Sequence, residues 1–344
     1  MAQGCERMQY KVGLYGGCFN PLHLGHVDCI IQAANMCEEL FLVLSVSKVH
    51  EEIDYRTRYR WLYQLTEHIG NVKLMILEDH CVSKDDYTPQ VAMADCEYIK
   101  AKIGKPIDAV FCGDDYGKDS FWSVCYPESQ FVSFHRNEMN STELRKAPYK
   151  HWDWIAHIAR PYFVKKVLLI GGESAGKSTL TINLAHRFNT NYIDEAGREI
   201  SMRSGTDELM LQQDYTEILL KHKLNEIEAV KHSNKVLFID TDALITRFYL
   251  EFLDKETSQK NTVLADAIDQ INSYDLILFL EPDVRFVQDG GRSEIIHENR
   301  EKYSEQIKEI FRTHHKNFVC ISGNYQNRYL QAIKEVEKLF NDSL

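Results

Sequence analysis

The segment from Gly171 to Ser178 has the residue types and spacing of a phosphate-binding loop. It fits the pattern Gly-x-x-x-x-Gly-Lys-Ser/Thr and lies between an apolar run, expected to be a strand, and a helical pattern. Glycines let the backbone turn so that successive N–H groups point at phosphate oxygens. The lysine reaches the β and γ phosphates, and the serine hydroxyl binds Mg²⁺. The segment predicts ATP binding by Gly171, Glu173, Ser174, Ala175, Gly176, Lys177, Ser178 and Thr179.

Three further polar segments are candidates to complete a phosphoryl-transfer site. Asp240 ends the apolar run 236–239 and would join Ser178 at the metal, with a plain turn or helix cap as the alternative. Glu195 follows the short expected strand 192–193 and could orient or deprotonate an acceptor hydroxyl, a role for which Asp194 is the other candidate. The alternative is a cluster of charged residues exposed to solvent. Arg292 follows two glycines and either closes over the transferring phosphoryl group or lies in a surface turn. The set favours a small-molecule kinase over a GTPase, because no Asn-Lys-x-Asp motif occurs.

A second constellation near the amino terminus reads Gly-Gly-Cys-Phe-Asn-Pro-Leu-His-Leu-Gly-His over residues 16–26. It also follows an apolar run and opens a helical pattern. Two imidazoles around a glycine can converge on one ligand, while the tight backbone admits phosphate close to the helix N-terminus. Zinc is the rival ligand, but no further His or Cys stands at zinc-ligand spacing. The catalytic candidates are His23 and His26, and the phosphate-binding candidates are Gly16, Gly17 and Phe19.

Composition bounds the class of protein. A chain of 344 residues is long for one hydrophobic core, and at about 150 residues per domain it suggests two. The net charge of -11 argues against a nucleic-acid surface, because phosphate neutralisation needs clustered Lys and Arg. The nine cysteines are scattered without a Cys-x-x-Cys pair, which suits a reducing cytoplasm. No apolar run approaches the ~18 residues of a membrane span, so a cytoplasmic location without membrane insertion is expected.

Short apolar runs alternate with helical stretches, the pattern of parallel sheets built from βαβ units. The fold class is therefore α/β, with a Rossmann-like domain over 1–155 and a P-loop kinase domain over 156–344. An amphipathic helix carrying Trp152, Trp154 and Tyr162 around Pro161 is expected at the seam. The expected strands are 12–15, 40–46, 72–77, 109–112, 131–134, 167–170, 192–193, 236–239, 276–280 and 318–321. The expected helices are 26–37, 59–68, 90–102, 177–188, 209–231, 243–253 and 329–340.

The histidine string resembles the signature of the nucleotidylyltransferase superfamily, whose members transfer AMP from ATP to a phosphate. The resemblance implies that His23 and His26 contact the ATP phosphates and stabilise a pentavalent transition state without a covalent intermediate. A second element of that superfamily, Ile-Ser-x-Thr-x-Ile-Arg, starts a late helix and binds phosphates. Residues 139–145 match it at Thr142 and Arg145, with Asn140 in place of the usual serine.

The order of the two motif sets resembles the NadR family of bifunctional nicotinamide-nucleotide adenylyltransferases and ribosylnicotinamide kinases. The resemblance implies that the second domain phosphorylates nicotinamide riboside to nicotinamide mononucleotide (NMN). The first domain would then join NMN to AMP from a second ATP, giving NAD and pyrophosphate, with Mg²⁺ needed in each step. Some members carry an amino-terminal helix-turn-helix repressor domain; here the first strand is expected by about residue 10, so neither that domain nor DNA binding is expected. The strings that carry the resemblance include Arg58-Tyr59-Arg60-Trp61-Leu62, Ala159-Arg160-Pro161-Tyr162-Phe163, Gly197-Arg198-Glu199 and Phe238-Ile239-Asp240-Thr241-Asp242.

The resemblance also implies a site for the nicotinamide ring, a cation that favours an aromatic face. Trp61, Trp122 and Tyr215 are the candidates, and each is otherwise a core or rim residue. Trp122 follows a glycine-punctuated strand end, where ligands of open α/β sheets gather. The other substrate-binding candidates are Asp194, Glu195, Arg198, Asp214 and Asp242.

Two alternatives stay open at this point. A fused phosphopantetheine adenylyltransferase and dephospho-coenzyme A kinase would carry both bare motifs, and only the wider strings separate it from the NadR family. A nucleotide sensor that binds NAD or ATP for regulation is the other class, although retention of both histidines and of Lys177 and Ser178 argues against a purely degenerate binder. The sequence also leaves open whether the chain forms a homo-oligomer and whether NMN is channelled.

Overall fold

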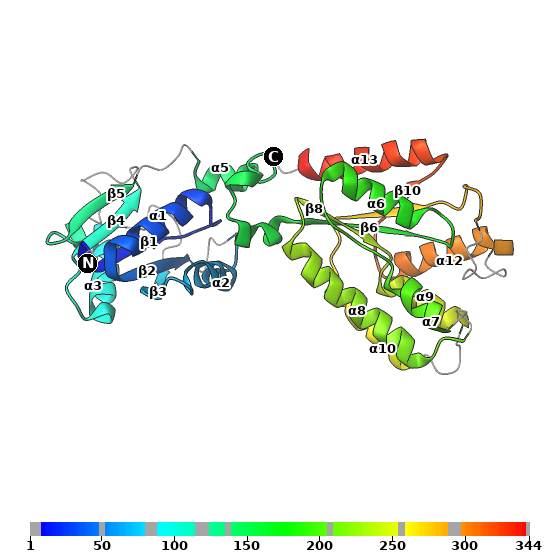
Figure 1. Ribbon diagram of the computed structural model, residues 1–344, viewed down its shortest axis with the longest axis horizontal. Coiled ribbons are helices and arrows are strands. Elements are labelled where there is room, and N and C mark those ends of the chain that lie inside the picture. The colour runs from blue at the N-terminus through cyan, green and yellow to red at the C-terminus, as the bar shows by residue number, and fades with distance from the viewer. Residues whose placement is uncertain are drawn as a thin grey trace, which may run out of the picture. The chain divides into compact units, whose positions relative to one another are not determined.

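The computed structural model describes residues 8–47, 52–79, 88–113, 124–134, 139–204, 209–253, 259–287 and 297–341. The chain divides into two compact units, residues 1–160 and 161–344 (Figure 1). The division places residues 156–160 with the first unit, a few residues beyond the boundary predicted from the sequence.

The first unit is built on a five-stranded parallel sheet with the strand order β3-β2-β1-β4-β5. Its three inner strands are mostly buried, as expected when helices cover both faces of a parallel sheet. The elements are β1 Tyr10–Gly17, α1 Leu24–Met36, β2 Cys37–Ser47, α2 Tyr55–Thr66, β3 Val72–Asp79, α3 Pro89–Ile103, β4 Ala109–Gly113, β5 Gln130–Phe134 and α5 Ser141–Lys146. One core cluster joins α3 to the sheet through Val12, Leu14, Val43, Cys96, Ile99 and Ile103.

The second unit is also built on a five-stranded parallel sheet, ordered β10-β9-β6-β8-β7. The strands are β6 Lys165–Gly171, β7 Tyr192–Ile193, β8 Val236–Asp240, β9 Leu276–Leu280 and β10 Val319–Ile321. The helices are α6 Lys177–Phe188, α7 Ala196–Ser204, α8 Gln212–Lys231, α9 Ala243–Leu253, α10 Gln259–Ile271, α12 Arg300–Thr313 and α13 Tyr325–Asn341. Helices α6 and α13 pack on the sheet through a cluster that includes Leu180, Leu184, Phe238, Leu278, Ala332 and Val336.

The α/β class with two parallel sheets is confirmed, and each predicted strand corresponds to a strand of the structure. The predicted seam helix is wrong: residues 150–165 contain two 3₁₀ helices, Trp152–Trp154 and His157–Phe163. Pro161 lies inside the second of these, and a proline has no N–H for an α-helical bond and disfavours the α conformation of the residue before it. The aromatic residues of the seam therefore do not follow the spacing of an α-helix.

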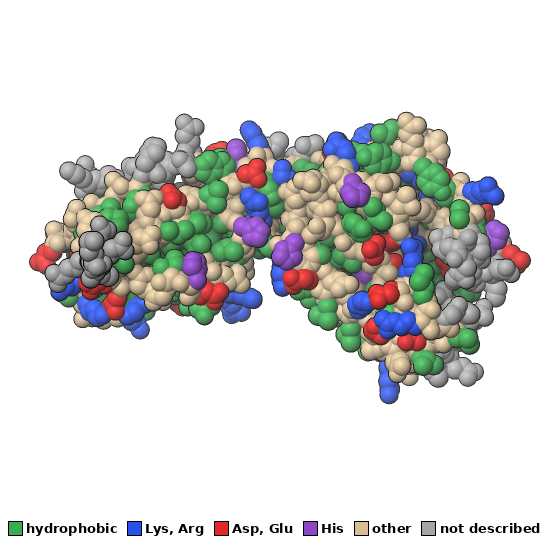
Figure 2. Space-filling model, viewed as in Figure 1, with side chains coloured by type: hydrophobic (Ala, Val, Ile, Leu, Met, Phe, Trp, Pro, Cys, Tyr) green, Lys and Arg blue, Asp and Glu red, His purple; other side chains and the backbone are tan. Residues whose placement is uncertain are grey.

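The surface carries both signs of charge. On the face shown in Figure 2, lysine and arginine side chains are scattered among acidic ones rather than gathered in one patch. None of the helices in the described ranges combines the length and the apolar character that crossing a membrane requires.

Candidate functional site

Both candidate loops follow the central strand of their sheet, at the point where the strand order reverses. β1 lies between β2 and β4, and β6 lies between β9 and β8. Open parallel sheets bind ligands beyond the carboxyl ends of their strands at this switch point, because the connections on either side leave in opposite directions. The fold thus places the two sequence motifs at the ligand-binding edge of their sheets.

Residues with positive φ bend the backbone between β6 and α6. Gly171 has a φ of 146° and Gly176 a φ of 87°. A Cβ atom on Gly171 would lie 2.7 Å from the carbonyl oxygen of Leu280 in β9, so no side chain fits there. Because α6 begins at Lys177, the N–H groups of its first turn have no partner within the helix and are available to phosphate.

Two arginines donate to carbonyl oxygens of the phosphate loop. Arg328, whose exposed fraction is 2%, donates from Nη1 to the carbonyl of Ala175 at 2.6 Å and also bonds carbonyls outside the loop. Arg300 donates to the carbonyl of Ser174 at 3.4 Å. Since N–H and C=O project to opposite sides of a peptide, holding these carbonyls turns neighbouring N–H groups toward the other side, where an anion can bind.

Lys177 and Ser178 occupy the start of α6, as the motif predicted. Lys177 is buried, and its Nζ donates to the carbonyl of Gly172 at 3.1 Å. The Ser178 hydroxyl accepts from Nη2 of Arg198, from the next helix, at 3.0 Å. The loop therefore carries one buried ammonium group and one hydroxyl that is already linked to a guanidinium group.

Asp240 ends β8 beside this loop and is 1% exposed. Neither of its carboxylate oxygens meets a donor in full hydrogen-bonding geometry, although the Ser178 hydroxyl lies close enough to act on its pKa, in the lowering direction. Burial, reinforced by the negative charge of Glu195, raises the pKa of Asp240 to about 6, although Lys177 acts to lower it. A buried carboxylate beside a single hydroxyl fits a cation, and Mg²⁺ characteristically takes one or two protein ligands together with waters and phosphates. No group of three His, Cys, Asp or Glu side chains in the described part of the chain forms a self-sufficient metal site.

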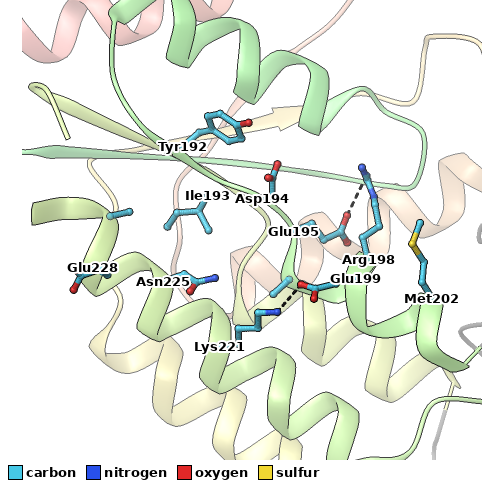
Figure 3. A pocket seen from close by; sticks show the side chains of 12 residues that line it. Tyr192, Ile193, Asp194, Glu195, Arg198, Glu199, Met202, Lys221, Asn225 and Glu228 are labelled. Carbon is cyan, nitrogen blue, oxygen red and sulfur yellow. Dashed lines mark hydrogen bonds and ion pairs between the residues drawn. The ribbon is translucent and has the colours of Figure 1, made fainter. Parts of the chain in front are cut away.

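A pocket of 720 Å³ lies among β7, α7 and α8 (Figure 3). Arg198 connects it to the phosphate loop, because its Nη2 lies 3.6 Å from Glu195 Oε2 and also donates to Ser178. On the α8 side, Lys221 forms an ion pair of 2.6 Å with Glu199 of α7. The pocket is lined by three of the predicted substrate-binding residues, Asp194, Glu195 and Arg198.

The two histidines of the first unit pack ring against ring where β1 gives way to α1. His23 and His26 are 2% and 6% exposed, and their ring centroids are 3.7 Å apart with an interplanar angle of 30°. Phe19 packs edge-on against His26 at 5.0 Å. A Cβ atom on Gly25 would lie 3.1 Å from the His23 ring, so glycine makes room for this close approach. The spacing around a glycine brings both imidazoles together, and their convergence on one ligand stays a prediction.

Side chains from later elements hold the backbone of this histidine loop, residues 18–23. Arg58 of α2, which is fully buried, donates to the carbonyl of Cys18. Arg145 of α5 donates to the carbonyl of Asn20 and, from Nη2, to the hydroxyl of Thr142 at 3.2 Å. The predicted phosphate-binding residues Thr142 and Arg145 thus lie beside the histidine loop.

The comparisons with known proteins cover both units. A cytidylyltransferase-like family model matches residues 14–176, and an AAA domain model matches residues 166–328. The trifunctional NAD biosynthesis/regulator protein NadR of Salmonella typhimurium is 28% identical, over 98% of this chain and 85% of that protein. The chain is a homologue of NadR. Crystal structures of NadR with NR, and with NAD and AMP-PNP, match with TM-scores of 0.80 and 0.78 at 21% identity, the former over 96% of each chain. These likenesses establish the fold of both units.

Asn140, which stands where the superfamily's phosphate-binding element has serine, has a clear structural role in this NadR homologue. Its Oδ1 accepts from the backbone N–H of Glu143 at 2.9 Å and so caps the N-terminus of α5. Asparagine and serine are both good N-cap residues. The substitution therefore preserves the start of the helix that carries Thr142 and Arg145.

Three predicted substrate residues of the kinase-like unit have structural contacts of their own. Asp242 is buried and caps α9, because its Oδ1 accepts from the N–H groups of Leu244 and Ile245 at 3.1 and 3.3 Å. Burial raises its pKa to about 7. Asp214 accepts from the N–H of Leu211 at 2.7 Å at the start of α8, and Tyr215 is buried. Their roles toward a substrate stay predictions.

For the remaining site candidates, Trp61, Trp122 and Arg292, the described residues show no contact with either site. Trp61 is buried in α2, with 5% of its surface exposed, so its ring faces are covered by protein. Arg292 and Trp122 lie outside the described residues. Conversely, the sequence analysis missed Arg300 and Arg328, which have no motif spacing relative to the phosphate loop and reach it only through the fold.

Proposed function

We propose that the chain is a bifunctional enzyme of NAD salvage. Its second unit phosphorylates the 5′-hydroxyl of nicotinamide riboside with ATP, and its first unit joins the resulting NMN to AMP from a second ATP, giving NAD and pyrophosphate. The observation that carries the proposal is homology to NadR over 98% of the chain, spanning both the histidine loop and the phosphate loop.

The chemistry of the second unit requires a held phosphate, a cation site and an acceptor site. The N–H groups of the loop and Lys177 would bind the β and γ phosphates of ATP, where charge develops during transfer. Glu195, in the pocket and 3.6 Å from Arg198, would orient or deprotonate the acceptor hydroxyl. Arg198 lines this pocket and donates to the Ser178 hydroxyl. Nicotinamide riboside bound in the pocket would therefore have its 5′-hydroxyl close to Ser178.

The chemistry of the first unit is an attack of the NMN phosphate on the α phosphorus of ATP. His23 and His26 would donate to phosphate oxygens that gain charge in the pentavalent transition state, and Thr142 and Arg145 would bind the same polyphosphate. Such a step depends mainly on positioning and on preorganised donors. Buried, mutually packed imidazoles meet that requirement, because they lose little freedom when the ligand binds.

Mg²⁺ is the proposed cofactor, held in the kinase site by Ser178 and Asp240 and supplying charge neutralisation at the phosphates. Asp240→Asn is expected to lower riboside phosphorylation at least about 100-fold, since a neutral amide cannot balance the cation. It should also raise the Mg²⁺ concentration needed for half-maximal rate. Kinase assays over a Mg²⁺ titration measure both. Glu337→Gln, at a surface ion pair on α13, is the matched control; equal Mg²⁺ dependence in both variants would remove Asp240 from the metal site.

The location and partners follow from the same proposal. ATP, nicotinamide riboside, NMN and NAD are the small-molecule partners, and the cytoplasm is the compartment that supplies them. No nucleic acid is required for either reaction. A homo-oligomer and a regulatory response to NAD are compatible with both activities. Sedimentation would measure the number of subunits, and its repetition with NAD would show whether NAD changes that number.

The test is to supply the purified protein with ATP and Mg²⁺, together with either nicotinamide riboside or phosphopantetheine, and to separate the products by chromatography. NMN and NAD are expected from the first mixture. Dephospho-coenzyme A or coenzyme A from the second, with no NAD from the first, would instead identify the fused coenzyme A enzyme. Tight NAD binding with turnover of neither substrate would identify a sensor.

A further inference from the structure

The histidine loop is closed by a segment from the far end of the first unit. The backbone of His23 forms an isolated antiparallel bridge with Ile155. Next to it, the N–H of Ala156 donates to the carbonyl of Leu22 at 3.2 Å. Both Ile155 and Ala156 are buried. Residues 155–160, termed here the strap, therefore pack against the backbone of Leu22 and His23.

Arg160 fixes the strap in place. Its Nε donates to the carbonyl of Ile155 at 3.2 Å, and its Nη2 to the carbonyl of Asp153 at 3.4 Å. The guanidinium carbon lies 5.7 Å from the centre of the buried Trp152 ring, within the range of a cation–π contact. The arginine thus joins three residues of one short turn, among them Ile155, whose backbone bridges to His23.

The carbonyls of the histidine loop share one pattern of recognition. Arg58 binds the carbonyl of Cys18, Arg145 binds that of Asn20, and the Ser141 hydroxyl donates to that of Pro21 at 3.3 Å. The strap completes the series at Leu22 through Ala156. Each of these carbonyls is held by a different residue, and the strap is the contact nearest to His23 along the chain.

We propose that Arg160 is a positioning residue for adenylyl transfer, acting on His23 through Ile155 and Ala156 without touching substrate. The inference rests on the proposed function of the first unit. Displacements of about 1 Å at a reacting centre can cost up to about 100-fold in rate even when they originate elsewhere. Because Arg160 holds a backbone rather than a ligand, its loss should change turnover more than substrate binding.

The test compares Arg160→Met, Arg160→Lys and Asp153→Asn in the full-length protein, with each half-reaction measured separately. Methionine keeps much of the volume but donates nothing, whereas lysine keeps the charge and one donor. Asp153→Asn is the matched control: its carboxylate is 96% exposed and 3.6 Å from Arg160, a surface ion pair of little energetic weight.

Arg160→Met is expected to lower kcat for NAD formation from NMN about tenfold, with the KM values for ATP and NMN within about twofold of wild type. Arg160→Lys should recover most of that loss and lie about threefold below wild type, and Asp153→Asn should match wild type. Phosphorylation of nicotinamide riboside should be unchanged throughout, which reports that the second unit is folded, and the unchanged KM values report that the first unit is folded.

Unchanged kcat in Arg160→Met, or a parallel loss of both half-reactions, would overturn the proposal. If Arg160→Met does not fold, Arg160→Lys decides: a wild-type kcat for adenylyl transfer would overturn the proposal, and a lowered one with intact kinase turnover would support it. A wild-type protein that forms no NAD from supplied NMN would refute the proposed function itself, a result distinct from any difference among the variants.

Discussion

Lys177→Ala is expected to abolish phosphorylation of nicotinamide riboside while leaving the conversion of supplied NMN to NAD intact. The buried Nζ of Lys177 donates to the phosphate loop at Gly172, so its positive charge is held next to the N–H groups that would receive the β and γ phosphates. Removal of one such preorganised donor typically costs about 100- to 1,000-fold in turnover. Separate assays of the two half-reactions measure the loss.

The charge of Lys177 also acts on Asp240, whose pKa it helps to lower. Its removal therefore weakens both the phosphate site and the ionised state of the proposed metal ligand. Lys338→Ala is the control, because Lys338 lies on the surface of α13 and pairs only with Glu335 among described contacts. A loss of both half-reactions in Lys177→Ala would contradict two separate active sites.

His26→Ala should give the reverse result: NMN accumulates from nicotinamide riboside and ATP, and NAD formation falls at least about 100-fold. His26 is 6% exposed and stacks on His23, so the substitution removes one proposed phosphate donor and the ring that packs against the other. Chromatography of the coupled reaction over time reveals the accumulated NMN. His68→Ala, at an exposed position after α2, is the matched control. NAD formation at the wild-type rate in His26→Ala would exclude His26 from the chemistry.

The sequence predicts those parts of the fold that local patterns determine. The bounds of α6, α9 and β9 agree with the structure residue for residue, because each combines an uninterrupted apolar pattern with a clear start or stop. Both glycine-rich loops were also placed correctly between a strand and a helix, because glycines at such spacing are typical of turns between these elements. Helices α7, α10 and α12 were missed, because their polar sequences form helices mainly through packing against neighbours.

Contacts that depend on the whole fold were beyond prediction. Arg58 and Arg160 entered the sequence analysis only as parts of family strings. In the structure Arg58 donates to the carbonyl of Cys18, far away in sequence, and Arg160 donates to the carbonyl of Ile155 within the same turn. Asp242 illustrates a different case: its position after a strand suggested a ligand contact, which stays a prediction, and the structure adds that its Oδ1 accepts from N–H groups of α9. Residue type and local spacing alone do not distinguish a cap from a ligand.

The strap also has a consequence for the order in which the molecule becomes functional during synthesis. The chain emerges from the ribosome amino terminus first, so His23 appears well before Ile155, to which its backbone is bridged. At roughly 5–20 residues per second, the ~130 residues between them take on the order of ten seconds to make. The first unit can assemble its five strands in that interval, but the histidine loop gains its last backbone partner only when the final residues of the unit arrive. Maturation of the adenylyl-transfer site is therefore timed by the end of its domain.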